Sequence, residues 1–206
     1  HQNCKRIPLQ STSAEYKKVV DQFNTTMLNR YTKITKIERI QNERWYKQVE
    51  SQYPFNWITF FVLDAAHRED FLQRYPKLDE RLLFHGCPST SADQIIEVVS
   101  IDHLPVLMVN EIQTKSSDIV FSIISVVYGC GVYFHAHATY SHQYASPNAA
   151  GERTIFLASV LVGRTVKGDK SMKVPPAGHD TTTDGQHIFV VYHDAGAYAD
   201  YLITYK

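Results

Sequence analysis

The N-terminal part of the chain carries a helical pattern of apolar positions. The apolar residues that recur there are Tyr16, Val19, Val20, Phe23 and Met27. Such spacing is typical of an amphipathic helix with one buried face. Thr12 and Glu15 stand three residues apart just before this run and match a capping box. The pattern predicts a helix over 12–28.

The following segment, "TKITKIERIQN" at 32–42, fits two structures. Isoleucine recurs at every third residue, as on one helix face, whereas the β-branched content favours a strand. Asn42 can cap a further helix that carries Trp45 and Val49. Residues 53–80 mix an apolar run with a charged one, and we expect helical cover on the core there.

The rest of the chain alternates short strands with one more helix. "RLLF" predicts a short buried strand, "SADQIIEVV" predicts a helix after Pro88, and 100–127 has no clear period. "TIFLASVLVG", "HIFVVYHD" and "YLITYK" are rich in Val, Ile, Phe and Tyr and predict strands. The Pro, Gly, Asp and Thr cluster at 173–186 predicts a long loop between the first two.

Composition places the chain among ordinary globular proteins. Its 206 residues are 44% hydrophobic and 20% charged, which favours a single domain over 1–206 with its own core. Lys plus Arg equals Asp plus Glu at 21 each, so no overall field attracts nucleic acid or an anionic membrane. The apolar runs are too short to span a bilayer. The start "HQNCKR" is neither Met nor a signal peptide, and we expect a module of a longer protein.

The cysteines indicate the compartment. Cys4, Cys87 and Cys130 are odd in number and widely spaced, which argues against a disulfide framework and against a closed zinc site. We therefore expect a reducing, intracellular setting, either cytoplasmic or nuclear.

Candidate chemistry gathers in "YGCGVYFHAHATYSHQY" at 128–144. Glycines such as Gly129 and Gly131 allow a backbone to turn tightly beside a ligand. Tyr133 and Tyr144 are eleven residues apart, close to three helical turns. If the residues between them are helical, both rings can line one slot for a flat aromatic ligand. Ser141, one turn before Tyr144, can then offer a hydroxyl to a polar edge of that ligand.

Several segments in order resemble the catalytic domain of the poly(ADP-ribose) polymerase superfamily, the diphtheria-toxin-like ADP-ribosyltransferases. The segments are "LLFHG", "YGCGVYF", "SHQY", the C-terminal "GAYADYLITYK" and the early "ITKIERIQNERWY", which is similar to the opening of the mono-ADP-ribosylating members. The resemblance spans nearly the whole chain. It implies an α+β ADP-ribosyltransferase fold, with two packed, mostly antiparallel sheets and peripheral helices.

The resemblance also implies roles for individual residues in binding NAD as co-substrate. His85 would hydrogen-bond a ribose hydroxyl, and the Gly86 backbone and Ser141 would hold the nicotinamide carboxamide. Tyr133 and Tyr144 would stack on the two faces of the nicotinamide ring. Cys87 stands where the family commonly has Ser or Thr, toward the adenosine half of NAD.

The third catalytic position of the family is a glutamate in its polymerising members. Aligning back from "GAYADYLITY" places Ile188 there, so the implied triad is His85, Tyr133 and Ile188. An isoleucine cannot polarise a ribose hydroxyl. The resemblance thus implies transfer of one ADP-ribose to a protein acceptor, which can be the protein itself. An acceptor carboxylate could help to stabilise the cationic sugar.

Two alternatives remain open. Tyr133 follows His85 by 48 residues, and "NEIQTKSSDIVFSIISV" between them lacks the Gly- and Arg-bearing pattern of the family's donor loop. If that segment closes over the cleft, NAD cannot enter, and the domain is an inactive pseudoenzyme that serves as a binding or scaffold module. A hydrolase built on the histidines would instead require a metal.

The remaining predictions concern metals and partners. His135, His137 and His142 lack a further ligand at suitable spacing, so we expect solvated polar positions and no metal site. We also expect a monomer without membrane contact. The family's helical regulatory domain is absent from this sequence, and the basic clusters are interleaved with apolar positions, so no direct nucleic-acid binding is expected.

Overall fold

A computed structural model describes residues 4–42, 73–74, 79–99, 127–193 and 196–206. Side chains of residues 42 and 97–99 fall outside this description. In the described ranges, no helix is both long enough and apolar enough to cross a membrane.

The described strands form one nine-stranded sheet in the order β1-β2-β9-β5-β3-β4-β8-β7-β6. In chain order they are β1 (Cys4–Pro8), β2 (Ile34–Asn42), β3 (Glu80–Cys87), β4 (Val132–His135), β5 (Arg153–Leu161), β6 (Thr165–Lys167), β7 (Thr181–Thr183), β8 (Ile188–Val191) and β9 (Ala197–Tyr205). Strands β6 and β7 are parallel, and the other neighbours are antiparallel.

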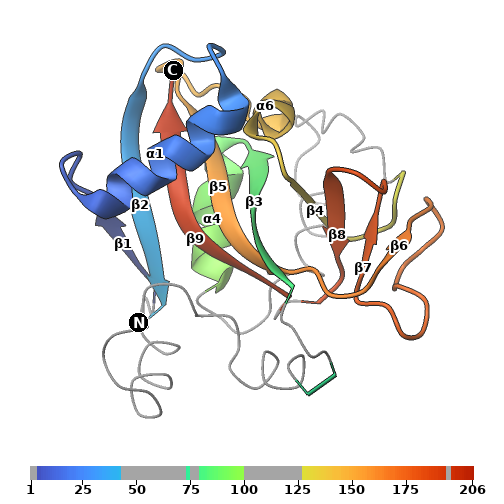
Figure 1. Cartoon of the computed structure of the whole chain (residues 1–206). Helices are drawn as coiled ribbons and strands as arrows, with labels where there is room; N and C mark the ends of the chain where they lie inside the picture. Colours follow the sequence, from blue (N-terminus) through green and yellow to red (C-terminus); the bar gives the residue numbers. More distant parts are fainter. Residues whose placement is uncertain (1–3, 43–72, 75–78, 100–126, 194–195) are drawn as a thin grey trace.

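This sheet consists of two halves that meet at one narrow junction. Strands β1, β2, β9, β5 and β3 form the inner half, and β4, β8, β7 and β6 form the outer half. The halves are joined by a single pair of partners, Phe84 on β3 and His135 on β4. The α+β class and the mostly antiparallel pairing are confirmed (Figure 1). The sequence predicted two packed sheets, whereas the described strands form one sheet whose halves are joined at β3 and β4.

Helix α1 (Ala14–Met27) confirms the N-terminal prediction but not its cap. Ser13, rather than Thr12, is the N-cap, and its hydroxyl accepts the backbone N–H of Tyr16 at 3.1 Å. The helix crosses the face of β2, β9 and β5 (Figure 1). Its buried residues are Val19, Phe23 and Met27, the set that the helical spacing predicts.

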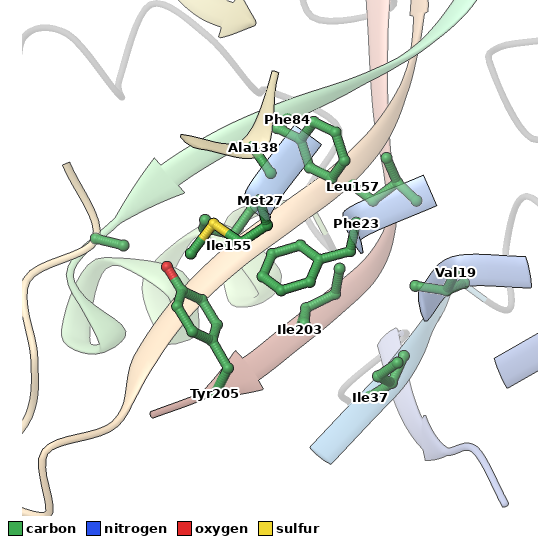
Figure 2. Close-up of a cluster of buried hydrophobic side chains, with 11 residues drawn as sticks. Val19, Phe23, Met27, Ile37, Phe84, Ala138, Ile155, Leu157, Ile203 and Tyr205 are labelled. Carbon is green, nitrogen blue, oxygen red and sulfur yellow. The ribbon is translucent and has the colours of Figure 1, made fainter. Parts of the chain in front are cut away.

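Phe23 lies at the centre of the core cluster beneath α1 (Figure 2). Its ring centroid is 5.2 Å from that of Tyr205 and 6.3 Å from that of Phe84. These edge or tilted arrangements are the favoured ones for aromatic pairs. Ile155 and Ile203 add aliphatic contacts from β5 and β9.

Helix α4 (Ser89–Val99) covers the opposite face of the inner half (Figure 1). Its Ile95 and Ile96 pack with Phe156 and Leu202. Side chains alternate between the faces of a strand, so Phe156 faces α4 while its neighbour Ile155 faces α1. The inner half is therefore buried on both faces, and the predicted helix after Pro88 is confirmed.

The structure settles the ambiguous segment and adds strands that the pattern did not show. Residues 34–42 form β2, so the β-branched content was the correct indicator. The predicted loop 173–186 is wrong in part, because Thr181–Thr183 forms the buried strand β7. Strands β1 and β6 were also missed; β6 and β7, at three residues each, are too short to show a period. The predicted helix with Trp45 and Val49 and the segment 100–126 lie outside the described residues.

The link between Tyr133 and Tyr144 is the clearest correction. Strand β4 continues to His135, helix α6 spans only Ala138–Ser141, and a 3-10 turn, η2, spans His142–Tyr144. The three-turn helix that the spacing suggested is therefore not formed. Tyr133 is presented by a strand and Tyr144 by a short turn.

Candidate active site

The candidate site lies on one face of strands β4 and β8. Tyr133 pairs with Val190 and His135 pairs with Ile188 across the two strands. Residues directly opposite in an antiparallel pair share a face, as do alternate residues of one strand. Tyr133, His135, Ile188 and Val190 therefore share one face. Phe134 and Phe189, on the other face, belong to the core.

His85 stands on β3, the strand next to β4, and its ring centroid is 5.6 Å from that of Phe134. Its Nδ1 lies 2.9 Å from the backbone oxygen of Tyr133. A carbonyl only accepts hydrogen bonds, so Nδ1 carries the proton and donates it. Burial lowers the pKa of His85, although the bond to Tyr133 opposes that shift. The neutral ring therefore leaves Nε2 as a hydrogen-bond acceptor.

Gly86 and Ser141 are in direct contact. A Cβ added at Gly86 would lie 1.8 Å from the backbone oxygen of Ser141, so only glycine allows β3 to approach α6 this closely. Ser141 is buried, and its hydroxyl donates to the backbone oxygen of Phe84 at 3.1 Å. The lone pairs of that hydroxyl remain as acceptors.

The Tyr133 hydroxyl holds the turn that precedes β4. It donates to the backbone oxygen of Gly129 at 2.8 Å and accepts the backbone N–H of Tyr128 at 3.0 Å. Burial raises the pKa of Tyr133 to about 12, so the phenol stays protonated at neutral pH. Gly129 has φ +127°, a backbone conformation that L side chains rarely adopt.

Two further residues fix the same turn and were missed in the sequence. The Thr182 hydroxyl lies 2.5 Å from the backbone oxygen of Tyr128 and 2.7 Å from the Tyr192 hydroxyl. Both residues come from the β7–β8 region, which the sequence assigned partly to a loop. A run of three threonines between two aspartates gives no signal for such a contact.

Tyr144 contacts Tyr140 directly, and Tyr133 is close enough to raise its pKa. Its hydroxyl donates to that of Tyr140 at 3.3 Å, and the two ring centroids are 5.6 Å apart. Burial raises the pKa of Tyr144 to about 12, and the nearby hydroxyls of Tyr140 and Tyr133 contribute. The two tyrosines predicted to stack on a ligand thus lie in one neighbourhood.

Cys87 is the predicted site residue whose side chain lies apart from this group. It is buried in the cluster under α4, together with Ala92 and Ile95. Burial raises the pKa of the Cys87 thiol to about 12. The thiol therefore belongs to the core, and its contact to the adenosine half of NAD stays a prediction.

The histidines near the site differ from the solvated positions that the sequence suggested. His135 is only 7% exposed, because the rings of Tyr140, His137 and His187 pack against it. His142 is half-buried, and its Nδ1 lies 2.9 Å from the Tyr205 hydroxyl. Among the described residues, no group of three or more His, Cys, Asp or Glu is arranged to hold a metal ion.

A cavity of about 550 Å³ lies elsewhere, at the outer end of the sheet. It is lined in part by Leu161, Pro175, His179 and Val191. Val191 belongs to the core on the face opposite Tyr133. None of the predicted site residues lines this cavity.

Comparison with known proteins shows which family this chain resembles. Residues 13–206 match the family described as the poly(ADP-ribose) polymerase catalytic domain. The chain is 28% identical to human protein mono-ADP-ribosyltransferase PARP14 and 31% identical to mouse protein mono-ADP-ribosyltransferase PARP12. It is 30% identical to a probable poly(ADP-ribose) polymerase of Dictyostelium discoideum.

These similarities cover the chain but only part of each relative. They span 100%, 98% and 97% of this chain, and 10%, 25% and 52% of the three relatives in the same order. The match to the family runs from the start of α1 to the C-terminal residue of β9 and beyond it to residue 206. The chain belongs to the poly(ADP-ribose) polymerase catalytic domain family.

Proposed function

We propose that this domain transfers a single ADP-ribose from NAD to a protein side chain and releases nicotinamide. The observation that carries the proposal is the buried, aliphatic Ile188 on the same face as Tyr133. In the family this is the position of the acid in polymerising members. Relatives named mono-ADP-ribosyltransferases favour activity over an inactive scaffold.

His85 would orient the ribose next to nicotinamide. Its Nδ1–H is engaged by Tyr133, so Nε2 would remain as the acceptor for a ribose hydroxyl. This fixed tautomer requires no proton movement during binding. Replacing the ring would leave the hydroxyl without its partner and the ribose free to rotate.

Tyr133, Tyr144 and the Gly86–Ser141 contact would hold nicotinamide. The two phenols supply faces for a planar pyridine, worth about 0.5–1.5 kcal/mol per ring pair beyond burial. Ser141 retains acceptor lone pairs for a carboxamide N–H, because its proton goes to Phe84. Holding ring and ribose in place favours cleavage of the bond between them, since the sugar carbon becomes cation-like as nicotinamide leaves.

Ile188 would limit the product to one ADP-ribose per acceptor site. Elongation needs a group that accepts a proton from, or polarises, a hydroxyl of the ADP-ribose already attached. A hydrocarbon side chain provides neither. The protein acceptor can be another protein or this protein itself.

Incubation of the purified domain with NAD, followed by intact-protein and peptide mass spectrometry, tests this function. We expect additions of one ADP-ribose unit per modified site and release of one nicotinamide for each. Tyr133→Ala should abolish both, and Tyr133→Phe, which keeps the ring, is the matched control. Chains of ADP-ribose units would contradict the role of Ile188, and NAD left intact at high protein concentration would contradict the transferase.

A further inference from the structure

A row of aromatic rings leads from the predicted nicotinamide site to the position of Ile188. Tyr144 contacts Tyr140, and Tyr140 stacks on His135 with ring centroids 4.2 Å apart and planes at 13°. The His135 centroid is 5.4 Å from that of His137 and 5.8 Å from that of His187. The rings of His137 and His187 lie 4.3 Å apart.

His135 is the fixed member of this row. Its Nδ1 accepts the backbone N–H of His137 at 2.7 Å, so any proton of the neutral ring sits on Nε2. Burial, followed by the charges of His137 and His187, lowers the pKa of His135 to about 4. His135 is therefore neutral at physiological pH, and it supports the other two rings.

His137 and His187 are the accessible members. Both are partly exposed, and neither ring has a hydrogen bond to another described residue. Asp184 fixes one of them: its Oδ1 accepts the backbone N–H groups of His187 and Ile188 at 2.8 and 2.9 Å. His187 is thereby held immediately before Ile188, at the start of β8.

The His137–His187 pair lies next to other ionisable groups. Neutral His135 on β4 contacts both rings, Tyr140 on α6 stacks on His135, and the carboxylate of Asp184 before β8 binds the backbone of His187. Burial acts to raise the pKa of Asp184, but backbone N–H groups at the turn lower it overall.

We propose that an imidazole nitrogen of the His137–His187 pair accepts the proton of a hydroxyl-bearing acceptor side chain, such as serine. The inference rests on the proposed transferase function and defines its acceptor. The pair stands beside Ile188, whose hydrocarbon side chain cannot accept a proton, and neither ring is hydrogen-bonded to another residue in the part of the chain that the structure describes.

The proposed transfer to a hydroxyl needs no reactant besides NAD, the acceptor and the imidazole. The acceptor oxygen bonds to the sugar carbon as the bond from that carbon to the nicotinamide nitrogen breaks, and the bond electrons stay on nicotinamide. The hydroxyl proton passes to the imidazole and then to solvent. A carboxylate acceptor has no proton to lose, so its modification does not need the pair.

Two peptides that differ only in one acceptor residue, serine or aspartate, test the proposal. With NAD, the wild-type domain should label the serine peptide. The double variant His137→Asn/His187→Asn keeps polar side chains but has no basic ring nitrogen. It should label the serine peptide about 10²–10⁴-fold more slowly, the usual contribution of a general base, and change the aspartate peptide less than about threefold.

Three readouts separate proton transfer from a structural effect. His193→Asn, at an exposed histidine away from the site, should leave both rates unchanged. Thermal unfolding with a benzamide-type nicotinamide mimic should show the same stabilisation in wild type and double variant. In a His137→Ala/His187→Ala protein, added imidazole should restore serine labelling.

Four outcomes would overturn the proposal. Equal losses on both peptides would assign the pair to general binding. Wild-type labelling of the aspartate peptide alone, removable by neutral hydroxylamine as expected for an ester, would show that no base is used. A double variant that does not fold is replaced by the single variant His187→Asn, judged by the same ratio of rates. Nicotinamide release without labelling of either peptide refutes this inference alone, whereas no release at all refutes the transferase and the inference together.

Discussion

The inner and outer halves of the sheet differ in what covers them. The inner half is packed on one face by α1 and on the other by α4, with apolar clusters on both sides. The outer half has its core on one face. Its other face carries Tyr133 and His135, whose polar atoms are bound to backbone groups. Stability and chemistry are thus concentrated in different parts of one sheet.

The junction between the halves places the proposed chemistry. Phe84 belongs to the core under α1, and its strand partner His135 belongs to the row of rings beside Ile188. His85, next along β3, reaches across to the backbone of Tyr133. The well-packed half therefore sets the position of groups in the half that would meet the substrate.

The largest effect is expected from a cavity in the inner half. Phe23→Ala removes a fully buried ring and should lower the free energy of unfolding by about 3–5 kcal/mol. Chemical denaturation measures this loss, and Val174→Ala, at an exposed side chain, is the control. If the halves have separate roles, ADP-ribose transfer per folded molecule should be unchanged at low temperature. A proportional loss of transfer would show that the core also sets the chemistry.

A smaller, pH-dependent effect is expected in the outer half. Burial lowers the pKa of His135 to about 4 in the folded protein, below its ordinary value of 6.5, so the unfolded chain binds the proton more readily. The contribution of neutral His135 to stability is complete above about pH 6.5 and is lost as pH falls toward about 4. The loss in unfolding free energy is on the order of 3 kcal/mol. His135→Phe keeps a ring beside Tyr140 but does not titrate.

Denaturation of the wild type and of His135→Phe between pH 7 and pH 4 measures that contribution. The difference in unfolding free energy between the two proteins should shift in favour of the variant as pH falls. His193→Asn controls for an exposed histidine. Parallel pH curves for wild type and His135→Phe would mean that His135 is not held neutral by its surroundings.

The smallest effect is expected from the Tyr133 hydroxyl. Tyr133→Phe removes its bonds to Gly129 and Tyr128 and should lower the free energy of unfolding by about 1–2 kcal/mol. Since the ring remains, the rate of ADP-ribose transfer should stay within about tenfold of wild type. A tenfold loss corresponds to about 1.4 kcal/mol in the activation barrier. A Phe variant as inactive as Tyr133→Ala would give the hydroxyl, rather than the ring, the main role.

The sequence by itself determined the helices and strands whose pattern is long enough to read. Val19, Phe23 and Met27 mark the buried face of α1, and the β-rich C-terminal third forms β5, β8 and β9. It also indicated the family, because several short motifs occur in the right order. These features depend on local periodicity and residue type, which the chain carries regardless of how it folds.

The tertiary structure alone decided which distant side chains meet. Nothing in a run of threonines places Thr182 against Tyr128, and the spacing of Tyr133 and Tyr144 suggested a helix where a strand and a short turn are found. His187 joins His135 and His137 only because β8 pairs with β4. Strand register and side-chain burial arise from contacts between segments far apart in the chain, so no local pattern encodes them.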